Sequence, residues 1–127
     1  MGRVKEEIRV NGQRFWTLFD SGSRNTYITP EVASHFAKVK LDKVRAVDLG
    51  GRTHRLKNIV ILKAKVEDKP VEINAYVIDR VGLDEKGREI HILLGALAMQ
   101  QWGIELNLKK EQLDLTHYPK EFIEFCG

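Results

Sequence analysis

The sequence predicts an all-β domain, a closed β-barrel with one or two short helices. Short apolar segments recur along the chain, and turn-forming residues separate them, as in barrels and sandwiches. Only two segments have a helical pattern, and both are short. No linker or low-complexity stretch divides the 127 residues. We therefore expect a single domain over residues 1–127, with its core at 8–115 and a tail at 116–127.

The first two predicted strands form a hairpin. Asn11-Gly12 separates the apolar stretches 8–10 and 13–19, and both turn residues tolerate the positive φ angles of a two-residue turn. The second stretch is apolar at nearly every position, which indicates that both of its faces are buried. Four turn formers, 20–23, then end it. A buried strand therefore leads Asp20 into a tight loop.

The middle of the chain predicts one short helix and two strand pairs. Thr29-Pro30 has the pattern of a helix start, with Thr29 as the N-cap. A hairpin over 44–56 turns at Gly50-Gly51. A second pair, 58–66 and 71–78, turns at 68–70.

The last third predicts a loop, a buried strand and a second helix. Residues 79–89 are polar and contain two glycines, so we expect a loop there. A strand over 90–94 reaches Gly95, and a helix over 96–102 ends at Gly103. Alternating leucines and isoleucine between 104 and 115 predict further short strands.

Two motifs and a hairpin resemble the aspartic proteases of the retropepsin type. The segment 15–28, FWTLFDSGSRNTYI, resembles their active-site strand and loop. The run 92–95, Ile-Leu-Leu-Gly before a short helix, resembles their second signature, and the Gly50-Gly51 hairpin stands in the place of their flap. The resemblance covers residues 8–115 and follows the order and rough spacing of the family.

The resemblance implies an aspartic endopeptidase that acts as a homodimer. The chain holds one Asp-Ser-Gly and is too short for a two-lobed enzyme, so the second carboxylate must come from another copy. Water activated between the two Asp20 carboxylates would hydrolyse a peptide or protein, with apolar residues preferred around the cut, and without a metal or cofactor. The implied site residues are the catalytic Asp20; Ser21, Gly22 and Ser23 in the supporting loop; Asp48, Leu49, Gly50, Gly51 and Arg52 in the flap; and Ile92, Leu93, Leu94 and Gly95 in the second signature.

The resemblance also implies local roles and departures. Ser21 would hydrogen-bond across the two-fold axis, Gly22 would let the backbone approach the dyad, and Ser23 would hydrogen-bond the Asp20 carboxylate. Arg24 stands where many viral enzymes have an acid, and Ala96 where they have an arginine, so that intrasubunit ion pair should be absent. Trp16, Leu18, Ile28, Val47 and Ile92 are the apolar residues expected near the substrate cleft.

Composition limits the other function classes. The 21 Lys and Arg are interspersed with 18 Asp and Glu, which disfavours nucleic-acid binding. No apolar run is long enough to span a membrane, and no signal peptide is visible. The single cysteine, Cys126, excludes an internal disulfide and indicates a reducing, cytoplasmic setting. The four histidines show no metal-ligand spacing.

Three alternatives remain open at this stage. The chain could be an inactive protease fold used for binding or dimerisation, because fold does not imply function. Asp20 could be an ordinary turn aspartate, and Gly50-Gly51 an ordinary hairpin turn. The tail carries Phe122, Ile123 and Phe125, which we expect to cover the barrel edge or join a dimer interface.

Overall fold

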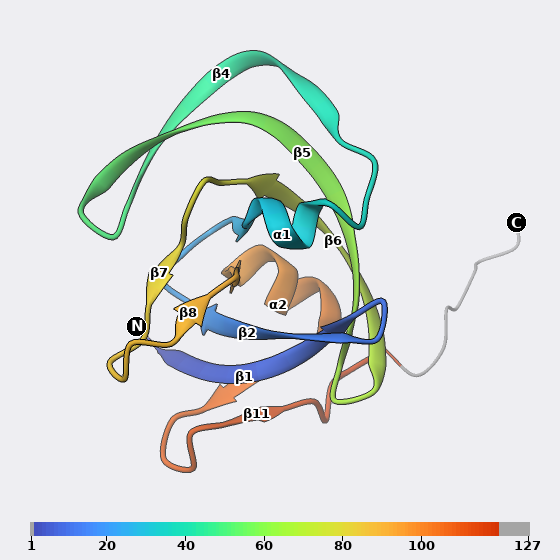
Figure 1. The fold of residues 1–127 in the computed structure, drawn as a ribbon. Helices are drawn as coiled ribbons and strands as arrows, with labels where there is room; N and C mark the ends of the chain where they lie inside the picture. The colour runs from blue at the N-terminus through green and yellow to red at the C-terminus, as the bar shows by residue number, and fades with distance from the viewer. Residues whose placement is uncertain (1, 120–127) are drawn as a thin grey trace, which may run out of the picture.

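The computed structural model describes residues 2–119 as one seven-stranded sheet with two small added sheets (Figure 1). The strand order in the main sheet is β1-β2-β9-β3-β6-β5-β4, and the pairs β7–β8 and β10–β11 form the small sheets. Two short helices accompany them, α1 (Pro30–Ala33) and α2 (Ala96–Trp102). The strands are β1 (Arg3–Val10), β2 (Gln13–Asp20), β3 (Thr26–Ile28), β4 (Val39–Leu49), β5 (Arg52–Val66), β6 (Lys69–Val77), β7 (Gly82–Leu83), β8 (Glu89–Ile90), β9 (Ile92–Leu94), β10 (Glu105–Asn107) and β11 (Gln112–Asp114).

The turn of the first hairpin sets the position of Asp20. Asn11 and Gly12 both have positive φ angles, 50° and 79°, so the turn has two residues and Val10 pairs with Gln13. From there the antiparallel register runs without a shift to the other end of the hairpin. Arg3 therefore lies opposite Asp20, at the end of the sheet furthest from the turn.

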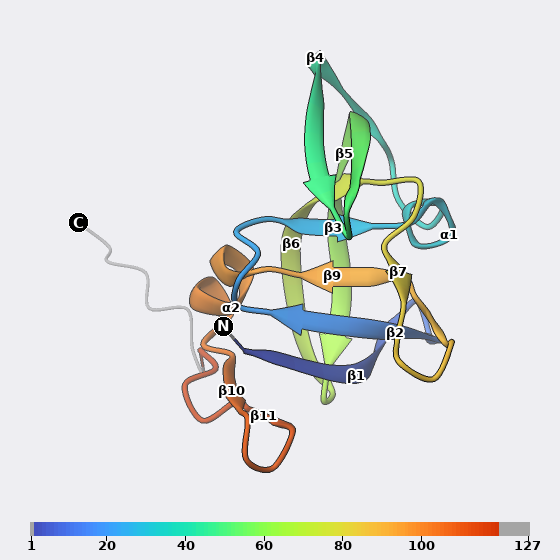
Figure 2. The same ribbon diagram turned by 90° about the vertical axis from the view of Figure 1, so that its left-hand side faces the viewer.

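Strand β9 lies between β2 and β3, although it comes much later in the chain (Figure 2). It runs parallel to β2, with Thr17 opposite Ile92 and Phe19 opposite Leu94, and antiparallel to β3. Because parallel strands end at the same edge of a sheet, the loops after β2 and after β9 meet. The fold thus brings the two sequence motifs side by side.

Both faces of β2 are buried, as its continuous apolar pattern predicts. Phe15 and Phe19 enter the main core, while Leu18 and the partly buried Trp16 join a second cluster that also contains residues of the β4–β5 hairpin. Phe19 is fully buried, and burying a side chain of this size stabilises the fold by roughly 1.5–3 kcal/mol. The strand that carries Asp20 is therefore held from two sides.

The prediction of a β-rich fold with short helices is confirmed. The prediction of a closed barrel is not, because β1 pairs with β5 at one position only. The curled sheet brings β1 to β5 through one residue pair, Arg9 and Lys65. This falls short of the continuous pairing that closes a barrel. The hairpin β4–β5 arches over the sheet on the side of α1 (Figure 1).

Three predicted boundaries were wrong. The turn between β5 and β6 lies at Glu67 and Asp68, both with positive φ, so Pro70 belongs to β6 and pairs with Lys65. The expected strand 90–94 is interrupted at His91, and its first part pairs with β7 inside the expected loop. Strand β4 begins earlier than predicted, with a bulge near its start.

Two further predictions concern the C-terminal tail and membrane-spanning segments. Phe122, Ile123, Phe125 and Cys126 lie outside the described residues. Within residues 2–119, no helix combines the length and the apolar character needed to cross a bilayer.

Candidate active site

Asp20 is the last residue of β2 and the only buried carboxylate among the described residues, with 6% of its surface exposed. The backbone N–H of Gly22 donates to its Oδ1 at 2.9 Å, and the Ser23 N–H donates to its carbonyl oxygen. Nε of Arg3 lies 3.3 Å from its Oδ2. A buried carboxylate is costly unless such donors surround it, so the loop is built to hold this group.

The serines of the loop have different partners. Ser21 is tied to Gly2: its N–H and hydroxyl both donate to the Gly2 carbonyl, and its Oγ accepts from the Gly2 N–H. The hydroxyl of Ser23 donates to the carbonyl of Asn25 at 3.1 Å. The expected hydrogen bond from Ser23 to the Asp20 carboxylate was therefore wrong, because the loop turns the Ser23 side chain toward its own backbone.

The second signature packs directly on the Asp20 loop. The Gly95 N–H donates to Oγ1 of the buried Thr26, and the Ala96 and Leu97 N–H groups donate to the carbonyls of Ser23 and Arg24. A Cβ at Gly95 would lie 2.2 Å from the Asn25 carbonyl oxygen, so only glycine fits. Arg24 and Ala96 stand where many viral enzymes have an ion pair. In this protein, backbone hydrogen bonds join the two segments at that place.

The predicted flap is a two-residue hairpin. Gly50 and Gly51 both have positive φ, and Leu49 pairs with Arg52 across them. Just beyond the tip, the buried His54 places Nδ1 2.5 Å from Oδ1 of Asp79 and Nε2 3.2 Å from the Leu49 carbonyl. Leu49 of this hairpin packs against the second cluster, and Gly50 lies near the Val81 carbonyl.

A comparison with protein-family models tests the sequence motifs. The model described as aspartyl protease matches residues 6–97, which include the Asp20 loop, the hairpin and the second signature. The chain belongs to the aspartyl protease family. No curated protein sequence matches it significantly.

Solved structures of this family confirm the retropepsin-like fold. The retroviral protease-like domain of Ddi1 from Leishmania major superposes with a TM-score of 0.65 at 13% identity, covering 91% of this chain and 90% of that domain. EIAV protease, solved with the inhibitor HBY-793, gives a TM-score of 0.57 at 16% identity, covering 84% of this chain and 94% of the viral one.

Two residues of the expected cleft lie elsewhere in this aspartyl protease domain. Ile28 and Ile92 are fully buried in the main core and cannot contact a peptide. Trp16 and Val47 keep partly exposed side chains beside the second cluster, and Leu18 lies within it. Of the five residues expected near the cleft, three therefore belong to this second cluster, which also contains residues of the hairpin.

Three residues of the site were missed by the sequence analysis: Arg3, Thr26 and His54. The signal for Arg3 was present, because a two-residue turn at Asn11-Gly12 sets residue 3 opposite residue 20. Thr26 and His54 contact residues 69 and 25 positions away, Gly95 and Asp79, which no local pattern reveals.

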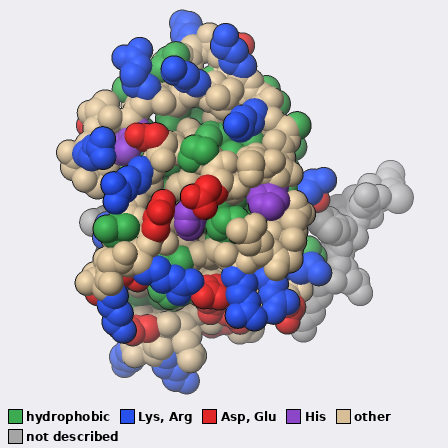
Figure 3. Space-filling model, viewed as in Figure 1, with side chains coloured by type: hydrophobic (Ala, Val, Ile, Leu, Met, Phe, Trp, Pro, Cys, Tyr) green, Lys and Arg blue, Asp and Glu red, His purple; other side chains and the backbone are tan. Residues whose placement is uncertain are grey.

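The surface charge agrees with the composition. On the face shown in Figure 3, Lys and Arg side chains are spread from the hairpin to the lower edge, with acidic side chains between them. No continuous basic stripe crosses this face, as a nucleic-acid site needs.

Proposed function

We propose that this protein is an aspartic endopeptidase that acts as a homodimer, with one Asp20 from each subunit forming the catalytic pair. The observation that carries the proposal is the buried Asp20 carboxylate, presented at the end of a strand whose loop packs on the second signature. Peptide hydrolysis by this chemistry needs two carboxylates within hydrogen-bond distance. Each subunit supplies one Asp-Ser-Gly, so a two-fold axis has to supply the second.

The proposed mechanism divides the roles of the two carboxyl groups. One Asp20 is ionised and takes a proton from a water molecule held between the two groups, and the water attacks the scissile carbonyl. The protonated Asp20 of the other subunit donates to the carbonyl oxygen. The tetrahedral intermediate then breaks its C–N bond, as the first Asp20 passes its proton to the amine nitrogen and the second takes a proton back from a hydroxyl of the intermediate. The Gly22 N–H holds the carboxylate orientation, and no covalent intermediate forms.

The hairpin of residues 48–52 would close over an extended peptide. Its two glycines allow the tip to move, and extended peptides bind such edges through backbone hydrogen bonds. Below it, the partly exposed side chains of Trp16, Val47, Leu49 and Val81 offer apolar contacts. These contacts support a preference for apolar residues around the cut.

A hollow beside the Asp20 loop supports the dimer. It has a volume of about 690 Å³, borders Gly2 and Ser21, and continues to Leu106 and the exposed Leu108. A second copy related by a two-fold axis near Asp20 would cover this apolar surface next to Ser21. Ser21 would then reach across the axis from a position already fixed by Gly2.

One observation favours the alternative of an inactive binding module. Within its own subunit, Asp20 already has an ion-pair partner in Arg3. If this pair persisted in the dimer, Oδ2 would not be free to share a proton with the partner carboxyl. The same experiment separates the two functions.

The test is digestion of a peptide library at pH ~4 to ~7, a range that brackets the titration of a carboxyl pair. We expect cleavage by the wild-type protein, none by Asp20→Asn, and full cleavage by Asp68→Asn, which alters an exposed turn aspartate. In mixtures of wild-type and Asp20→Asn subunits, the remaining activity should be proportional to the square of the wild-type fraction. Cleavage that survives Asp20→Asn contradicts the assignment. A dimer without cleavage supports the binding module.

A further inference from the structure

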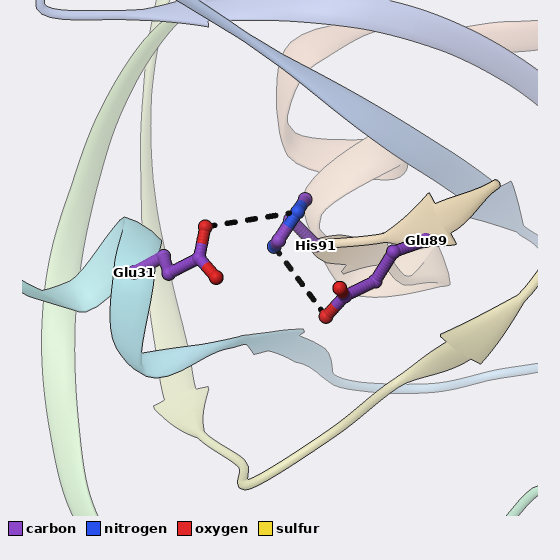
Figure 4. A group of neighbouring side chains, drawn as sticks. All are labelled: Glu31, Glu89 and His91. Atoms are coloured by element: carbon purple, nitrogen blue, oxygen red, sulfur yellow. Dashed lines mark ion pairs between the residues drawn. The ribbon is translucent and has the colours of Figure 1, made fainter.

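A cluster of three side chains lies beside the middle of β2, away from Asp20. Glu31 of α1, Glu89 of β8 and His91 bring one ligand atom each to within 4.8 Å of one another (Figure 4). Nε2 of His91 lies 3.8 Å from Oε2 of Glu31, and Nδ1 lies 4.0 Å from Oε2 of Glu89. We propose that these three residues bind a divalent transition metal ion, with Zn²⁺ as the best match.

The proposed site is distinct from the catalytic loop. His91 directly precedes Ile92, which pairs with Thr17, and its N–H donates to the carbonyl of Trp16. Asp20 is four residues further along β2, and a strand advances about 3.3 Å per residue, so the two sites are roughly 13 Å apart.

The ring of His91 is held in place before any metal binds. Its Nδ1 lies 3.0 Å from Oγ1 of Thr29, and the ring packs edge-on against Phe15. The backbone is fixed as well, since the Thr29 N–H donates to the His91 carbonyl. We assign the Nδ1–H as the donor to Thr29, so the metal binds Nε2, on the side of Glu31. The exposed Glu89 side chain, now nearer Nδ1, turns toward Nε2 to complete the site. Metal-binding histidines usually have such an outer partner for the second ring nitrogen.

The hydrogen bond between Thr29 and His91 takes the place of a helix-capping hydrogen bond. Thr29 is the N-cap residue of α1, but its side chain makes no capping hydrogen bond to the helix. An N-cap threonine normally stabilises its helix through that bond. Here the hydroxyl is used to orient His91 instead.

The choice of metal follows from the ligands and their spacing. Imidazole suits zinc and its neighbours better than magnesium or calcium, and carboxylates complete a mixed nitrogen and oxygen set. Tetrahedral Zn²⁺ with bonds of about 2.0–2.1 Å sets ligand atoms about 3.3 Å apart. The three ligand atoms lie within 4.8 Å of one another, and the glutamate side chains are 68% and 48% exposed, so they can move toward His91. The movement needed is up to about 1.5 Å. Bound metal would join α1 to β8.

The sequence concealed this site because Glu31 is 60 residues from His91, whereas metal motifs are recognised by short spacings. The fold brings the residues together by placing α1 beside the break between β8 and β9 (Figure 4).

The test is calorimetric titration of metal-free protein with Zn²⁺ alone, repeated with Cys126→Ser to separate any thiol contribution. We expect one zinc per chain in both proteins and a rise in Tm with zinc. Glu31→Gln and Glu89→Gln change exposed side chains and should still fold, and each should weaken zinc binding at least 10-fold. Thr29→Val, which removes the outer partner, should weaken it about 10-fold.

The matched control is the His117–Glu105 pair, whose Nε2 and Oε1 are also 3.8 Å apart but which belongs to no three-ligand group among the described residues. Glu105→Gln should leave zinc affinity unchanged. With Co²⁺ as the probe, the absorption spectrum should show nitrogen and oxygen ligands without a thiolate band. The absence of a saturable one-site isotherm in the wild-type protein overturns the proposal, as does unchanged affinity in both glutamate variants.

Discussion

Nε of Arg3 lies 3.3 Å from Oδ2 of Asp20, the residue directly opposite it in the β1–β2 hairpin. The Arg3 side chain is 70% exposed, whereas that of Asp20 is 9% exposed. The ion pair therefore joins an exposed surface cation to the group on which the proposed chemistry depends. In the proposed dimer, Arg3 and the partner carboxyl would compete for the same oxygen.

Removing this cation should raise activity. We expect Arg3→Gln to increase kcat/KM by roughly 2- to 5-fold, because an exposed ion pair contributes up to about 1 kcal/mol and its loss frees Oδ2 for the shared proton. Arg9→Gln, which breaks the exposed Arg9–Asp68 pair on the same strand, is the control and should have no effect. Loss of activity in Arg3→Gln would mean that Arg3 assists the reaction.

The contact between the two motifs should be intolerant of any side chain at Gly95. A Cβ there would lie 2.2 Å from the Asn25 carbonyl oxygen and 2.8 Å from that of Ser23, and both are backbone atoms. We expect Gly95→Ala to reduce the free energy of unfolding by about 3 kcal/mol, measured in urea, because overpacking forces the backbone apart.

Gly12→Ala is the matched control for Gly95→Ala. Gly12 faces open space but has a φ of 79°, so its loss should be limited to about 1 kcal/mol of backbone strain. Equal losses in the two variants would contradict the steric explanation.

Local patterns predicted the parts of this fold that depend on near neighbours. Asn11-Gly12 predicted a hairpin, and the continuous apolar run before Asp20 predicted a strand buried on both faces, and both were correct. The insertion of β9 between β2 and β3 has no local signal, since its partners are distant in sequence, and it was not predicted. The same limit explains why Thr26, His54 and the Glu31–Glu89–His91 cluster were missed.

His54 should control the position of the hairpin. Its side chain is 4% exposed and contacts both Asp79 and the Leu49 carbonyl. We expect His54→Ala to destabilise the protein by roughly 1–3 kcal/mol, because the Leu49 carbonyl loses its donor and the packing is reduced. Amide exchange at Arg52 and Thr53 should accelerate, as measured by hydrogen–deuterium exchange.

Thr53→Val is the control for His54→Ala. It removes an exposed hydrogen bond to Asp48 within the same hairpin, so it should change stability by less than about 0.5 kcal/mol.

The hydrogen bond from His54 also lowers the pKa of Asp79 below its usual value. The stability from this bond should therefore be lost as the pH falls below 3.8. Unchanged exchange in His54→Ala would show that the hairpin is positioned by other contacts.

Glu6 should make the stability of the protein fall as the pH rises from 4.5 to about 7. Burial raises the pKa of Glu6 from 4.5 to about 7, and the nearby Glu67 carboxyl adds to the rise. Its Oε2 is buried without a hydrogen-bond partner. The folded state therefore binds more protons than the unfolded state between these pH values, and stability decreases across that window.

Glu6→Gln should remove this pH dependence. We expect it to be more stable than wild type at pH ~8 by on the order of 1 kcal/mol, after allowing for solvent screening of a partly exposed group. The measurement is Tm against pH for both proteins. Glu7→Gln is the control on the same strand, because Arg88 lowers the pKa of Glu7 and the sign is reversed. Parallel Tm curves for wild type and Glu6→Gln would show that Glu6 remains ionised in the folded protein.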